Sequence, residues 1–97
     1  MIVRWTPEAL DDRRDIWDFI AAENPLSAAE LDLRFEASAV QLADHPEIGR
    51  TGLIPGTREL IPHTHYRIIY EIQQNTVWVL AVVHTARQWP SAKNRSL

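Results

Sequence analysis

The spacing of hydrophobic residues changes near Pro46. Before Pro46, apolar residues recur every three or four positions, which is typical of amphipathic helices. After it they alternate or form short continuous runs, which is typical of strands. The β-branched and aromatic stretch Ile2–Trp5 predicts a strand ahead of the helices. The predicted order is β-α-α-β-β-β, an α+β fold with a helical hairpin packed on a mainly antiparallel sheet.

The helical hairpin is expected to run from Pro7 to about Asp44. Thr6 is a good N-cap, and proline is favoured at the position that follows it. The first helix should stop near Asn24-Pro25, because a residue before proline disfavours helical backbone angles. The second helix begins there or at a capping box that starts at Ser27. The apolar residues expected to face the core are Leu10, Ile16, Trp17, Ile20, Ala21, Ala28, Leu31, Phe35, Ala39 and Leu42.

The second half of the chain is expected to hold one long loop and three strands. All three glycines fall between Pro46 and Thr57, and loops of this length are often functional. We expect a strand at Thr57–Ile61, stopped by Pro62. Strands at His65–Gln73 and Thr76–His84 should follow, and the last is apolar on both faces, as a central strand would be.

Composition limits the class of protein. A chain of 97 residues is expected to form one domain, residues 1–97, with the polar residues 91–97 as a flexible tail. Hydrophobic residues make up 45% and charged residues 24%, which are ordinary globular values. No apolar run approaches the roughly 20 residues of a membrane span, and residues 1–5 lack the apolar core of a signal peptide. There is no cysteine. We therefore expect a cytoplasmic protein without membrane contact.

Charge is distributed unevenly along the chain. The net charge of −3 argues against a surface that binds nucleic acid throughout. Between Glu8 and Glu47 there are eleven acidic residues and three arginines, a net charge of −8. Residues 48–97 carry a net charge of +4. An anionic partner should therefore meet the second half of the chain.

Four side chains in that half are expected to gather at one end of the sheet. Arg58 lies near the start of its strand, whereas His84, Arg87 and Trp89 lie at or beyond the end of the last strand. Arg67 lies nearer the start of the middle strand, so whether it joins this cluster stays open. Such a cluster could bind an anion, with His84 as a proton donor or acceptor near neutral pH.

A structural interpretation of the same residues stays open. Arg58 and Arg67 could pair with Glu59 or Glu71, and His84 could be a hydrogen-bonded residue at the edge of the core. Trp89 would then be a lid over the end of the sheet or a contact surface.

Two further histidines raise the question of a metal. His63 and His65 lie on the same face of an extended segment, but a zinc site needs three or four ligands, and no cysteine or acidic residue is near them in sequence. We expect no metal site. No cofactor-binding motif is present either, so we expect no cofactor.

Four short motifs carry a resemblance to a known family. They are Gly49-Arg50, the "GTREL" of Gly56–Leu60, the "YRIIYEI" of Tyr66–Ile72 and the "VVHTARQW" of Val82–Trp89. In this order and spacing the chain resembles the RelE/ParE superfamily of toxins from bacterial type II toxin–antitoxin modules, over nearly its whole length. The resemblance implies a cytoplasmic toxin that arrests growth and is neutralised by a cognate antitoxin, whose gene is adjacent.

The resemblance implies one of two activities. RelE-like members cut messenger RNA in the ribosomal A site, and ParE-like members poison DNA gyrase. On the nuclease pattern Arg67 matches the arginine that contacts the scissile phosphate, and Arg58 matches a basic residue of the preceding strand. Arg87 matches an arginine beyond the last strand. His84 could correspond to a histidine that some nucleases use near this strand end.

The chain also departs from the nuclease pattern. Leu60 stands where RelE-like nucleases have a lysine, and Trp89 stands where they have a tyrosine. The acidic balance is unlike that of a ribosome-binding nuclease. The resemblance therefore favours ParE-like action on gyrase, with Arg87 and Trp89 in contact with the target; the alternative is a nuclease with Arg58, Arg67, His84 and Arg87 as catalytic residues.

Overall fold

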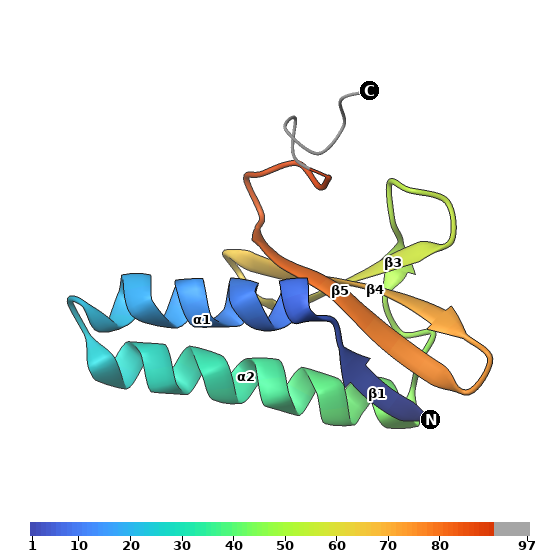
Figure 1. Ribbon diagram of the computed structural model, residues 1–97, viewed down its shortest axis with the longest axis horizontal. Helices are drawn as coiled ribbons and strands as arrows, with labels where there is room; N and C mark the ends of the chain where they lie inside the picture. The colour runs from blue at the N-terminus through green and yellow to red at the C-terminus, as the bar shows by residue number, and fades with distance from the viewer. Residues whose placement is uncertain (91–97) are drawn as a thin grey trace.

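A helical hairpin packs on one face of a five-stranded sheet in the computed structural model, which describes residues 1–90 (Figure 1). The elements are β1 (Ile2–Trp5), α1 (Pro7–Ala21), α2 (Pro25–Asp44), β2 (Arg50–Thr51), β3 (Thr57–His63), β4 (Tyr66–Gln73) and β5 (Thr76–His84). The predicted α+β fold is confirmed, with β2 as an additional strand. The tail expected at residues 91–97 lies outside the described residues.

The sheet is antiparallel except at one edge. Its strand order is β1-β5-β4-β3-β2, and only β1 runs parallel to its neighbour, β5. β1 pairs with residues Thr76–Val79 of β5 and then leads into α1. The second half of β5 therefore has β4 as its strand neighbour on one side and no β1 residue on the other.

Both helices begin at the polar residue that precedes a proline. The Thr6 hydroxyl accepts a hydrogen bond from the backbone N–H of Ala9 at 3.1 Å. The side chain of Asn24 accepts one from the backbone N–H of Ser27 at 3.1 Å. Each bond satisfies a donor that has no partner within the first turn of its helix. Of the two predicted starts for α2, the structure has the one at Asn24-Pro25.

The buried face of α1 differs from the predicted one. Ala9 is fully buried, and Ile16 and Ile20 pack beside it on the core, whereas Leu10 and Trp17 are exposed. Residues 9, 16 and 20 lie on one stripe of a helix, about 90° from the stripe of residues 10 and 17. The prediction that Leu10 and Trp17 face the core is wrong. The face of α1 that packs on the sheet is the one that carries the small side chain of Ala9.

The third strand also differs from its prediction. β3 continues through Pro62 to His63, with a register irregularity between Leu60 and His63. β2 pairs only with Arg58 and Glu59, so the second half of β3 has no β2 residue beside it. Proline is tolerated at such an edge, because its missing N–H does not leave a neighbouring strand without a donor. Pro62 therefore does not end the strand.

Tyr70 anchors the loop between α2 and β3. Its side chain is fully buried, its hydroxyl donates to the carbonyl of Pro46 at 2.7 Å, and it accepts from the N–H of Gly49 at 2.9 Å. Burial raises the pKa of the Tyr70 phenol. A Cβ atom at Gly49 would lie 2.7 Å from that hydroxyl, so only glycine lets the loop approach so closely.

We expect Tyr70→Phe to lower the free energy of unfolding by about 1–3 kcal/mol, because it leaves a buried N–H and a carbonyl without their partner. Urea unfolding followed by circular dichroism measures the change. Tyr66→Phe is the matched control, since the Tyr66 hydroxyl makes no hydrogen bond to any described residue, and it should change stability by less than about 0.5 kcal/mol. Equal effects of the two variants would contradict the anchoring role.

Candidate functional site

The structure separates Arg58 from the other predicted site residues. Arg58 lies opposite Tyr70 in the sheet, whereas His84 lies opposite Tyr66 at the far end of β4. β3 and β5 both run antiparallel to β4, so they run in the same direction and their starts lie together. The predicted cluster of Arg58 with His84 is therefore wrong. The Arg58 guanidinium instead donates to the carbonyl oxygens of Glu47 and Gly49 and supports the loop before β3.

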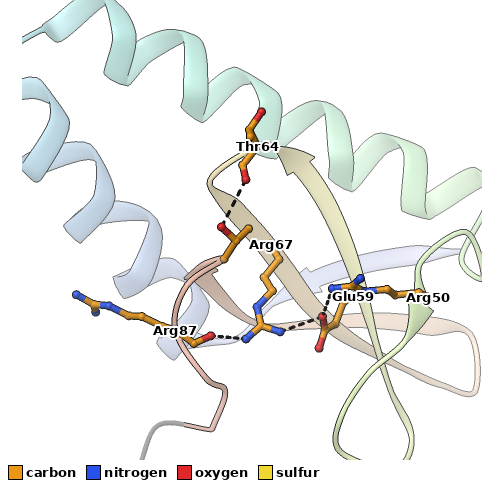
Figure 2. Close-up of polar contacts among 6 residues, drawn as sticks. Arg50, Glu59, Thr64, Arg67 and Arg87 are labelled. Carbon is orange, nitrogen blue, oxygen red and sulfur yellow. Dashed lines mark hydrogen bonds and ion pairs between the residues drawn. The ribbon is translucent and has the colours of Figure 1, made fainter.

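Arg67 forms an ion pair beside the sheet (Figure 2). Its guanidinium lies 2.9 Å from the Glu59 carboxylate, which Arg50 also approaches at 3.2 Å. A second Arg67 nitrogen donates to the backbone carbonyl of Arg87. The Arg67 side chain is only 13% exposed and that of Glu59 is 7% exposed. The ion-pair interpretation thus holds for Arg67 and not for Arg58.

The electrostatics of this pair keep Glu59 ionised. Burial by itself raises the pKa of a carboxyl group, but hydrogen bonds from Arg67 and Arg50 more than offset it and hold the pKa of Glu59 below its usual range. Glu59 is thus the anionic partner of Arg67, and it shares its carboxylate with Arg50. Figure 2 shows the Arg87 side chain extending away from this pair, so Arg87 is linked to it only through its backbone.

His84 lies among other aromatic rings at the end of β5. The His84 ring stacks on His65 with 5.8 Å between centroids and meets Tyr66 edge-on at 5.5 Å. His63 lies 5.5 Å from His65, and burial, followed by the charges of His65 and Arg34, lowers the pKa of His63. Sequence reasoning treated His63 and His65 apart from His84. Their meeting follows from the β3–β4 turn, which brings residues 63–66 beside the end of β5.

The ring nitrogens of His84 have different environments. Its Nδ1 accepts a hydrogen bond from the backbone N–H of Ala86 at 3.1 Å, which leaves Nε2 as the atom that can reach a partner. Within residues 1–90, no group of three or more histidine or acidic side chains is placed to hold a metal ion. The rings of His63, His65, Tyr66 and His84 therefore present imidazole and aromatic surface to a partner.

Two adjoining pockets form a groove between α1 and the end of β5. The first has a volume of about 490 Å³ and the second about 600 Å³, and they share Asp12, Val83 and Arg87. We call this the α1–β5 groove; its α1 side includes Glu8, Asp11, Asp12, Asp15, Ile16 and Phe19, and its other side includes Tyr66, Val82, Val83, His84, Arg87 and Trp89. The predicted residues His84, Arg87 and Trp89 thus border one depression.

Sequence reasoning missed the α1 side of the groove. Asp12 and Asp15 were not among the predicted site residues, and nothing in their spacing indicates that α1 lies beside β5. Arg87 is exposed and forms no ion pair within the described residues. The site therefore combines one accessible guanidinium, one imidazole and large apolar rings, a combination common in protein-binding surfaces.

Comparison with known proteins agrees with this fold. Residues 3–89 match the family model described as the ParE toxin of the type II toxin–antitoxin system parDE. The chain is 37% identical over 89 residues to a putative toxin, Y4kP, of Sinorhizobium fredii, covering 91% of this chain and 92% of that one. It is 36% identical over 85 residues to the toxin RelE2 of Caulobacter vibrioides, covering 88% and 96% respectively.

Two solved structures share the fold. A chain of the chromosomal ParDE system of P. aeruginosa superimposes with a TM-score of 0.75 at 19% identity, over 87% of this chain and 95% of that one. A YoeB/ParE toxin of Agrobacterium tumefaciens superimposes with a TM-score of 0.60 at 14% identity, over 87% and 98%. At these identities the likeness concerns the fold. No helix within residues 1–90 is long and apolar enough to cross a membrane.

Proposed function

Because the chain belongs to the ParE toxin family of type II toxin–antitoxin systems, we propose that it arrests growth by poisoning DNA gyrase. It does so as a cytoplasmic protein without a cofactor, by binding the enzyme rather than by cutting a nucleic acid. Arg87 and Trp89 contact the target, and His84 supports that surface. A cognate antitoxin neutralises it.

The state of Arg67 is the observation that supports this proposal most strongly. Phosphodiester cleavage needs positive charge directed at the transition-state phosphate. Arg67 is instead mostly buried and paired with Glu59. Arg58 is bonded to backbone carbonyls in a different part of the molecule. Two of the four residues that a nuclease would use are thus engaged in holding the fold.

A second candidate function is a RelE-like, ribosome-dependent mRNA endonuclease. The observation in its favour is the position of His84 and Arg87 on one pocket, with His65 stacked on His84. An imidazole could move a proton and the guanidinium could neutralise a phosphate. In that case the nuclease would have to work without Arg58.

The two functions predict different products from the same purified chain. Freed of antitoxin, it would be incubated with gyrase, ATP and plasmid, and separately with ribosomes carrying a defined message. We expect gyrase-dependent cleaved DNA and intact messages. Arg87→Ala should weaken gyrase poisoning about 30-fold, the effect of losing an interface hot spot of about 2 kcal/mol.

Arg4→Ala is the matched control for Arg87→Ala. Arg4 is also an exposed arginine without an ion pair among the described residues, but it lies on β1 and does not line the groove. Its loss should leave gyrase poisoning within about twofold, because it lies outside the surface proposed to meet the target. Cuts in the ribosomal A site that disappear with His84→Ala, together with unaffected gyrase, would overturn the proposal in favour of the nuclease.

A further inference from the structure

Three histidines meet where the turn between β3 and β4 lies against the end of β5. The His65 ring lies between the other two, with its centroid 5.5 Å from that of His63 and 5.8 Å from that of His84. The His65 and His84 rings are within 17° of parallel. We call His63, His65 and His84 the histidine cluster. Imidazole is the side chain whose charge ordinarily changes near neutral pH, so a change of charge here falls on the contact between two segments.

Two of the three rings accept a hydrogen bond that only a neutral ring can accept. Nδ1 of His63 accepts from the backbone N–H of His65 at 3.2 Å, and Nδ1 of His84 accepts from that of Ala86 at 3.1 Å. A neutral imidazole that accepts at Nδ1 carries its proton on Nε2, and a second proton would occupy Nδ1 and place one N–H against another. Protonation therefore breaks the bond by which each ring holds its own turn.

Hydrogen bonds join the β3–β4 turn to the segment that follows β5. The backbone N–H of Thr85 donates to the carbonyl of His65 at 2.8 Å, and the Thr85 hydroxyl donates to the carbonyl of Thr64 at 3.4 Å. These contacts lie beside the two turns that the rings of the histidine cluster hold. The same segment continues to Arg87 and Trp89, so a change at the rings reaches residues that line the α1–β5 groove.

The charged side chains around the histidine cluster do not cancel the charge of protonated rings. They are Arg34 of α2, whose charge acts on His63, and Asp12, Asp15 and Arg87, which share a pocket with His84. Two carboxylates and two guanidiniums together carry no net charge. Arg67 lies on the other face of β4 from Tyr66 and is paired with Glu59. Protonated rings at 5.5 and 5.8 Å would therefore repel one another.

We propose that the histidine cluster is a pH-sensitive switch, which holds the β3–β4 turn on the segment after β5 when its rings are neutral and releases that segment when they are protonated. Release frees the backbone that carries Arg87 and Trp89, and it alters the α1–β5 groove on the side of β5. The switch is a property of the chain itself and does not depend on whether the target is gyrase or a message.

The pKa of His63 indicates the pH range of the switch. Burial, followed by the charges of His65 and Arg34, lowers this pKa from its usual value of 6.5. The folded chain thus binds this proton less readily than the unfolded chain does. The contribution of the neutral ring is complete above about pH 6.5 and is lost as pH falls through the lower, folded-state value. We therefore expect release below pH 6.5.

Hydrogen exchange of the purified chain, followed by NMR and corrected for the intrinsic effect of pH, tests the switch. The protection factor of the Thr85 amide should fall about tenfold between pH 7.5 and pH 5.5, because its bond to His65 opens. The amide of Ile69, in the middle of the sheet, should keep its protection within about twofold. An equal loss at Ile69 would show general unfolding and overturn the inference, as would unchanged protection at Thr85.

A double variant identifies the rings as the cause. His63→Asn with His84→Asn keeps side-chain oxygens that can accept from the N–H two residues on, but asparagine takes up no proton in this pH range. The loss of Thr85 protection should shrink to less than about twofold in this variant. His45→Asn is the matched control, because His45 is an exposed histidine at the end of α2, and it should keep the full tenfold loss. Equal losses in the two variants would contradict the switch.

The tautomers of the unsubstituted chain give a measurement that needs no variant. Nitrogen-15 NMR of the imidazoles at pH 8 should show the proton of both His63 and His84 on Nε2, because each Nδ1 accepts a hydrogen bond. A proton on Nδ1 of either ring would overturn the inference, even if the double variant did not fold. None of these measurements involves an antitoxin, gyrase or ribosomes, so the switch can fail while gyrase poisoning holds, and the reverse.

Discussion

Replacing Glu59 with alanine is expected to lower the free energy of unfolding by about 3–5 kcal/mol, the usual cost of removing one partner from a buried ion pair. Glu59 accepts from Arg67 at 2.9 Å and from Arg50 at 3.2 Å, and its side chain is almost fully enclosed. Its removal leaves the Arg67 charge buried without an anion. Urea unfolding at neutral pH measures the loss, with Glu71→Ala, a less buried carboxylate of the same sheet, as the control.

A double substitution separates the effect of the unpaired Arg67 charge from the effect of the packing lost with the Glu59 side chain. Glu59→Leu combined with Arg67→Met removes both charges and replaces them with apolar side chains, so it should recover most of the stability. The pH dependence gives an independent check. Because the folded-state pKa of Glu59 is lowered, its contribution is complete above the unfolded-state value near pH 4.5 and is lost as pH falls through the folded-state value. This part of the acid dependence should disappear in Glu59→Ala; an unchanged profile would contradict the pairing.

Phe35→Ala should destabilise the chain by a similar amount, about 3–5 kcal/mol, through the cavity that it leaves. Phe35 is 1% exposed and belongs to the cluster through which α2 meets the sheet. Its ring also meets Tyr66 edge-on, with centroids 6.1 Å apart at 85°. Because Tyr66 in turn contacts His84, we expect the loss of Phe35 to loosen the residues around the end of β5 as well.

Phe19→Ala is the control for Phe35→Ala, because it makes the same substitution at an exposed position. Phe19 is on α1 and most of its ring is exposed, so its loss should change stability by less than about 0.5 kcal/mol. The two variants are compared by thermal and urea unfolding. If Phe19→Ala destabilised the chain as much as Phe35→Ala, the assignment of the core to the α2–sheet contact would be wrong.

The site was only partly predictable from the sequence. His84, Arg87 and Trp89 lie within six residues of one another, so their proximity is local and needs no knowledge of the fold. The place of Arg58 depends on the direction of β3 relative to β5, and the prediction paired the wrong strand ends. The groove requires α1 to lie beside β5, which brings Asp12 to Val82 across 70 residues of chain.

The sequence by itself determined both helices, four of the five strands and their order, but not the short strand β2. Thr6-Pro7 and Asn24-Pro25 set the helix starts through side-chain caps that reach only three residues along the chain. The change of apolar period near Pro46 separated the helices from the strands, because burying one face requires a different spacing in each. Such short-range effects are the same in any fold, which is why these predictions are confirmed.

Only the tertiary structure decided which side chains meet. Ala9 rather than Leu10 faces the core because α1 packs on the sheet through the face that carries its small side chain. Pro62 stays within β3 because β2 is too short to reach it. Arg67 is engaged because Glu59 lies within 3 Å of it on the neighbouring strand. Each outcome depends on strand direction, register and the length of a neighbour, which are set by packing between distant segments and leave no trace in local spacing.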